Sequence, residues 1–198
     1  MSKFLGPIHY WLYGKIQLQD ALVAEIADYA SRRGWRYDPE LVTSDLRPLE
    51  SLIDTANIHG WLQGRIASSE SRYAKLVSCL VEEDEGRLAE LEQVAYSFGE
   101  HHKVQADANC NDAYHQFDEV LLNGMPCDRV NQVVEGDVDR FVWRQTQNLH
   151  GHFWVEAGGK GQWYDRLRMR EMEGMLSGTS MQLTKEDDDV FVIEKKVA

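Results

Sequence analysis

The sequence predicts a mainly α protein: a bundle of five to six helices with a small C-terminal β-hairpin. Apolar residues recur at alternating spacings of three and four through most of the chain, as on one face of a helix. A nine-residue segment recurs 50 residues later, and the last stretch changes to short β-branched runs around an acidic turn. We expect residues 1–160 to form the helical bundle. Residues 161–198 should add a final helix and the hairpin, packed on the same domain.

The internal repeat predicts two similar helices. Residues 8–16 read IHYWLYGKI and residues 58–66 read IHGWLQGRI. The helical spacing continues for several turns after each copy, which is typical of a seam between helices that pack nearly parallel or antiparallel. Pro7 suits the first turn of the first helix and Gly34 its end, while the second helix is predicted to start near Pro48.

Four further helices and a hairpin are predicted for the rest of the chain. The helices are expected at about 85–105, 108–122, 126–156 and 162–176. The glycines at 158–161 separate the last two, and the final helix lacks a clean apolar stripe. The hairpin is predicted around the acidic turn at 185–189, and we expect it to dock on the helices because a lone hairpin is marginally stable.

Composition excludes several classes of partner. The chain has 33 acidic and 21 basic residues, a formal net charge of −12, which disfavours binding to nucleic acid and to anionic membrane surfaces. No apolar run approaches the roughly 18 residues that a membrane helix needs. The 3 cysteines are scattered without a CxxC motif, so a reducing cytoplasmic location is expected. The usual glycine-rich nucleotide-binding motifs are missing from the sequence.

The histidines are the first candidates for chemistry. His9, His59, His102 and His152 fall on the apolar stripes of four different predicted helices, so their imidazoles are expected to point to a common interior. Asp20 and Glu70 follow two of these histidines on nearly the same helix face, about 16 Å further along the axis. Each carboxylate would therefore have to meet a histidine from a neighbouring helix.

These six side chains predict a transition-metal site in the bundle. Iron or zinc suits imidazole ligands, and a haem is a further candidate. The alternative is that each buried histidine is held by ordinary hydrogen bonds in the core.

The predicted architecture over residues 5–156 resembles that of helical-bundle metal proteins, such as the ferritin-like group. The motifs depart from that group, because no Glu-x-x-His occurs and Asp112-x-x-His115 is the nearest match. Asp112, His115 and Glu119 share one helix face, which is more typical of a solvated surface than of a metal site. The resemblance therefore implies an architecture and no family membership.

A cysteine and four aromatic residues are the remaining candidates. Cys127 lies near the start of the helix predicted at 126–156, where a helix N-terminus would favour a catalytic thiolate. The alternative is an ordinary residue near a helix start, whereas Cys110 lies on an apolar stripe and is expected in the core. The aromatic residues could line a pocket for a small apolar or aromatic ligand, or seal an interface. They are Trp11, Trp61, Phe153 and Trp154.

These observations lead to one hypothesis and two alternatives. The hypothesis is an interior histidine-rich metal site that supports redox or hydrolytic chemistry, although the sequence leaves open whether the protein is an enzyme. One alternative is a non-catalytic assembly protein that self-associates as a homodimer through its helix seams. The other is a sensor bundle that holds a small ligand between helices.

Overall fold

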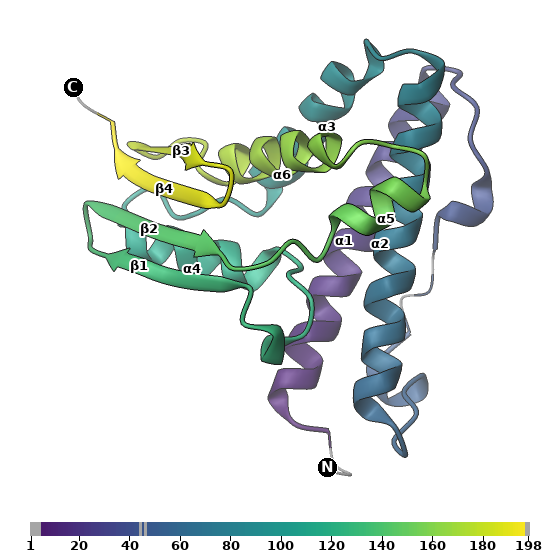
Figure 1. Ribbon diagram of the computed structural model, residues 1–198, viewed down its shortest axis with the longest axis horizontal. Helices are drawn as coiled ribbons and strands as arrows, with labels where there is room; N and C mark the ends of the chain where they lie inside the picture. Colours follow the sequence, from purple (N-terminus) through teal and green to yellow (C-terminus); the bar gives the residue numbers. More distant parts are fainter. Residues whose placement is uncertain (1–4, 44, 46, 197–198) are drawn as a thin grey trace.

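The computed structural model describes residues 5–43, 45 and 47–196 (Figure 1). The predicted mainly α fold with a C-terminal hairpin is confirmed. The helices within the described residues are α1 (Pro7–Arg32), α2 (Ile58–Glu83), α3 (Arg87–His101), α4 (Cys110–Val120), α5 (Gly151–Glu156) and α6 (Gly161–Met175). The strands are β1 (Asn131–Gly136), β2 (Arg140–Gln145), β3 (Met181–Asp187) and β4 (Val190–Lys195).

The internal repeat corresponds to α1 and α2, which lie side by side and run parallel (Figure 1). Residues that are 50 positions apart meet across the seam: the Gln19 amide donates to Ser69 Oγ at 3.3 Å, and the rings of His9 and His59 are 6.1 Å apart. The second helix begins at Ile58, later than predicted, because Asn57 caps it by accepting a hydrogen bond from the Gly60 N–H. Equivalent residues of the two repeat copies thus lie at the same level along two parallel helices.

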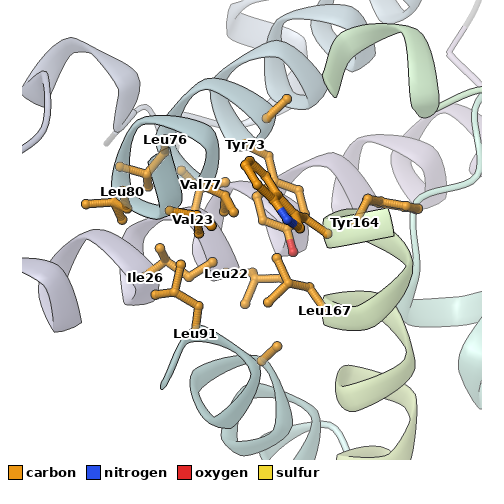
Figure 2. Close-up of a cluster of buried hydrophobic side chains, with 14 of the residues drawn as sticks. Leu22, Val23, Ile26, Tyr73, Leu76, Val77, Leu80, Leu91, Tyr164 and Leu167 are labelled. Carbon is orange, nitrogen blue, oxygen red and sulfur yellow. The ribbon is translucent and has the colours of Figure 1, made fainter. Parts of the chain in front are cut away.

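The main hydrophobic core lies where α1, α2, α3 and α6 meet. Figure 2 shows aliphatic side chains of α1 and α2 pointing toward Leu91 of α3 and Leu167 of α6. Tyr73, Trp154 and Tyr164 close one side of this cluster with edge-on ring contacts, and Trp154 reaches it from the short α5. Burial of these stripes holds the helices together, since apolar burial is the main favourable term in folding.

Helices α3 and α6 cross at very short range through two glycines. A Cβ built on Gly99 would lie 2.0 Å from the Glu171 carbonyl oxygen, and one built on Gly174 would lie 2.0 Å from the Tyr96 carbonyl oxygen. Each glycine therefore allows the opposing backbone to occupy the space that a side chain would need.

The prediction of one helix at 126–156 is wrong. This segment forms β1, β2 and the short α5, and only α5 is helical in it apart from a three-residue 3-10 turn at Pro126–Asp128. The β-branched and aromatic residues of the segment favour a strand, and Gly136-Asp137 allows a turn between two of them. The decisive partner is β4, because the antiparallel sheet order is β1-β2-β4-β3. One sheet is thus built from both sides of the division suggested at residue 160.

The buried face of the sheet packs on α4 and α6 and forms a second core cluster. Its sheet residues are Phe141, Trp143, Met181, Leu183, Phe191 and Ile193. Figure 1 shows the sheet beside α4 and at the far end of α6 from α5. None of the helices described is long and apolar enough to cross a bilayer.

The glycine crossing gives a direct test of the fold. We expect Gly174→Ala to lower the free energy of unfolding by about 2 kcal/mol or more, because the methyl group would force α3 and α6 apart. Gly14→Ala is the matched control: it is also a helical glycine, but its Cβ would meet nothing within 4 Å. This control should gain about 0.5–1 kcal/mol from helix propensity. Urea unfolding of both variants measures the two effects, and equal effects would contradict the close crossing.

Candidate functional site

The four histidines do not share an interior position. His59 and His152 are exposed, so the prediction that all four point into the core is wrong. His102 is half-buried at the end of α3, where its ring lies 4.8 Å from that of Phe98. Only His9 and His59 come near each other, at the first turns of α1 and α2. Among the residues that the structure describes, no group of three or more His, Cys, Asp or Glu is placed to hold a metal ion. Metal binding therefore stays a prediction.

The two predicted carboxylates are buried, but their partners are residues that the sequence did not indicate. Asp20 Oδ1 accepts hydrogen bonds from Ser69 Oγ at 2.7 Å and from Arg72 Nη2 at 2.6 Å. Glu70 meets a histidine of another element, as its position required, but this is His150, whose Nδ1 lies 3.1 Å from Glu70 Oε1.

The candidate thiol and the residues of the Asp112 face lie on the protein surface. Cys127 is exposed in the 3-10 turn Pro126–Asp128, so the long helix that would have activated it is missing at this position. Cys110 is buried in the second core cluster, as expected. Asp112, His115 and Glu119 are all exposed, which confirms the solvated surface.

The four aromatic candidates lie in different places. Trp154 is fully buried in the main core, and Phe153 packs half-buried against it. Trp61 lies beside Tyr13 near the N-terminal ends of α1 and α2, with ring centroids 6.0 Å apart. Trp11 lines a surface cleft.

This cleft is a ligand-sized space in the part of the chain that the structure describes. It has a volume of about 410 Å³, which is within the range of small-molecule sites. It lies between α1, α4 and the segment that connects α4 to β1. Its lining consists of Ile8, Trp11, Lys15, Tyr114, Asp118, Asn123, Gly124, Met125, Pro126, Arg129, Val130 and Asn131.

Lys15 is the unusual residue of the cleft. It is only 3% exposed, although lysine is rarely buried without close partners. Its Nζ lies 3.9 Å from the centre of the Trp11 ring and 3.7 Å from Asp118 Oδ1. Burial lowers the pKa of Lys15 to about 8, and the Asp118 carboxylate offsets part of that effect. The group is thus mainly cationic at neutral pH, with one carboxylate at a long ion-pair distance.

Three neighbours complete the cleft. The Trp11 indole N–H donates to Glu119 Oε2 at 3.0 Å, which holds the ring over Lys15. Arg129 has a φ of 49°, a left-handed conformation that costs a non-glycine residue about 1–2 kcal/mol. The Asn131 side-chain oxygen is buried without a hydrogen-bond partner. Strained backbone and unpaired polar atoms are features that concentrate at functional sites.

A buried set of charged residues extends from the cleft into the main core. Arg168 of α6 donates to the Asn123 side-chain oxygen at 2.6 Å and lies over the Tyr164 ring. Beyond it, Glu171 borders an internal cavity of about 10 Å³, room for about one water molecule. Burial raises the pKa of Glu171 to about 7, and the Arg168 guanidinium opposes the shift.

The Glu70–His150 pair lies at the inner end of this charged set. Burial alone would raise the pKa of Glu70, but the charge and hydrogen bond of His150, together with Gln19 and Arg168, outweigh burial, so the pKa is lowered. The His150 ring stacks on Tyr164 with centroids 4.3 Å apart, which connects the pair to α6.

The sequence carried a weak signal for these residues. Lys15 lies between the core positions Leu12, Ile16 and Gln19 of the first stripe, where a cation is unexpected. The helix predicted at 162–176 lacked a clean apolar stripe for a similar reason. Arg168 and Glu171 occupy the buried face of α6 together with apolar residues. Charged residues at core positions of a helix could therefore have indicated this site from the sequence.

Comparison of the chain with models of known families, with curated proteins and with solved structures gives no match. The site must therefore be interpreted from its own geometry.

The raised pKa of Glu171 predicts a pH-dependent stability. The folded protein keeps the Glu171 proton up to about pH 7, whereas an unfolded chain releases it near 4.5. Between these values the wild type becomes less stable as the pH rises. We expect Glu171→Gln to be up to about 3 kcal/mol more stable than wild type at about pH 8, with little difference at about pH 5. Urea unfolding across this range measures it, and a constant difference would contradict it.

Glu70→Gln should show the opposite dependence. The lowered pKa of Glu70 means that its carboxylate stabilises the fold above the ordinary value of 4.5, and that this stabilisation is lost as the pH falls further. The variant removes the carboxylate that lies 3.1 Å from His150 Nδ1 and leaves this buried ring without its polar partner, so we expect a loss of about 1–3 kcal/mol at neutral pH. The difference in stability between the variant and the wild type should become smaller below about pH 4, which thermal unfolding measures. A gap that widens in acid would contradict the pairing.

Proposed function

We propose that the protein binds a small organic anion, bearing a carboxylate or phosphate group, in the cleft above Lys15. The observation that carries this proposal is the buried Lys15 ammonium, which borders a ligand-sized cleft with a single carboxylate at 3.7 Å. A buried cation is costly unless charge and hydrogen bonds compensate it. The anionic group of a ligand would supply the missing acceptors.

The distribution of charge supports an anionic ligand. The chain as a whole carries a net charge of −12, and that field disfavours anions at most of its surface. The cleft differs, because Lys15 and Arg129 outnumber Asp118 among its lining residues. A local excess of positive charge on an acidic protein favours a specific anion site over general attraction.

The remaining lining suits the organic part of the ligand. Ile8, Trp11, Met125 and Pro126 provide apolar surface around the charged groups. The unpaired Asn131 oxygen would accept a hydrogen bond from a hydroxyl or amine of the ligand. Most small-molecule sites combine apolar walls with a few polar groups in this way.

The free cysteines support a location in a reducing compartment such as the cytoplasm. Cys79, Cys110 and Cys127 are all unpaired, and Cys127 is exposed. An exposed thiol is more compatible with a reducing environment than with an oxidising one.

Lys15→Met is the direct test of the proposed function. The probes are inorganic phosphate, phosphoglycolate, pyruvate and benzoate, each titrated while tryptophan fluorescence and ligand NMR are followed. We expect at least one of the organic anions to bind the wild type, and Lys15→Met to weaken its binding at least tenfold, about 1.4 kcal/mol.

Lys75→Met is the matched control, because it removes the same charge from the exposed surface of α2. This variant should bind like the wild type. The proposal fails if none of the organic probes binds, or if Lys15→Met binds as tightly as the wild type. Inorganic phosphate, which has no carboxylate, and pyruvate, which has no phosphate, distinguish a phosphate from a carboxylate preference.

Arg129→Gly separates binding from stability. Relief of the left-handed strain, about 1–2 kcal/mol, should largely offset the extra freedom of glycine in the unfolded chain, about 0.5–1 kcal/mol. We therefore expect a free energy of unfolding within about 1 kcal/mol of wild type. Affinity for the anion that binds the wild type should fall at least fivefold, about 1 kcal/mol. Unchanged affinity would show that the Arg129 side chain lies outside the site.

A further inference from the structure

We propose that the Lys15 amine captures 2-oxo acids covalently, forming an imine with the carbonyl carbon. This inference rests on the proposed function, because the carboxylate of the 2-oxo acid would occupy the anion site. It adds a chemical activity to binding and names a ligand class that carries an anionic group beside a carbonyl.

The position of the amine favours this reaction. Lys15 is only 3% exposed, and the Trp11 ring covers Nζ at 3.9 Å. The amine thus has little freedom to turn away from the cleft, and a positioned nucleophile reacts faster than a mobile one. Exposed lysines such as Lys75 and Lys103 lack this enclosure.

The protonation state of the amine allows nucleophilic attack. With a pKa of about 8, about a tenth of the Lys15 side chains are neutral at pH 7. Lysines that act as nucleophiles reach this state in the same way, through desolvation of the ammonium group.

Asp118 is the group that can move the protons. Its carboxylate lies 3.7 Å from Nζ, so it can receive the proton that the ammonium group releases. The neutral nitrogen then attacks the carbonyl carbon, a C–N bond forms, and the carbonyl oxygen takes up a proton. Loss of this oxygen as water leaves a protonated imine. The ammonium group and the ketone are thereby converted to the iminium ion and one water molecule, without an oxidant or reductant.

Reductive trapping tests the inference. The full-length protein is incubated at pH 7 with pyruvate or glyoxylate and sodium cyanoborohydride, and each lysine is followed by peptide mass spectrometry. We expect Lys15 to be modified at least tenfold faster than Lys75 and Lys103. Phosphoglycolate, which has no carbonyl group able to form an imine, should slow labelling of Lys15 and leave the exposed lysines unaffected.

Lys15→Arg separates this inference from the proposed function. Arginine keeps the cation but lacks the nucleophilic amine, so the variant should still bind pyruvate in the NMR titration while the rapid labelling disappears. Binding of pyruvate by the wild type without preferential labelling of Lys15 would overturn the inference and leave the proposed function standing. Failure of all the organic anions to bind, together with uniform labelling of the lysines, would overturn both.

Discussion

The charge of Lys15 must be compensated within a largely enclosed part of the molecule, and this constraint connects the cleft to the interior. Lys15 lies against Asp118 of α4, while Arg168 of α6 reaches the same region through Asn123. Among the residues that line the cleft, Lys15 and Arg129 are cationic and Asp118 is anionic, and the nearby Glu119 carboxylate also acts on Lys15. The anion-binding proposal depends on the charges of the cleft lining, whereas the lowered pKa of Lys15 comes mainly from its burial.

The parallel α1–α2 pair gives these charges fixed positions. α1 contributes to the main core through residues such as Val23 and Ile26, and to the cleft through Trp11 and Lys15. Because both regions belong to one helix, a shift of α1 in its seam with α2 would move the amine relative to Asp118. Packing in the core therefore determines geometry at the cleft.

The sheet supports the other wall of the cleft. Its second core cluster includes Phe117 of α4 and Trp143 of β2, which pack with ring centroids 6.3 Å apart. The segment that connects α4 to β1 contains Arg129 in its left-handed conformation. A strained residue can persist there because the structure on both sides over-determines its backbone.

The sequence by itself determined the mainly α class, the repeated helices α1 and α2, and the C-terminal hairpin, because periodicity and turn residues are local properties. It also indicated that Glu70 would need a histidine from another element. Tertiary structure decided which one, and it decided that the Val133 and Trp143 segment pairs as strands, since strand pairing with β4 depends on residues far along the chain. Tertiary structure also decided the cleft. Lys15, Asp118 and Arg129 are distant in sequence, and only the packing of α1 against α4 brings their charges to one place.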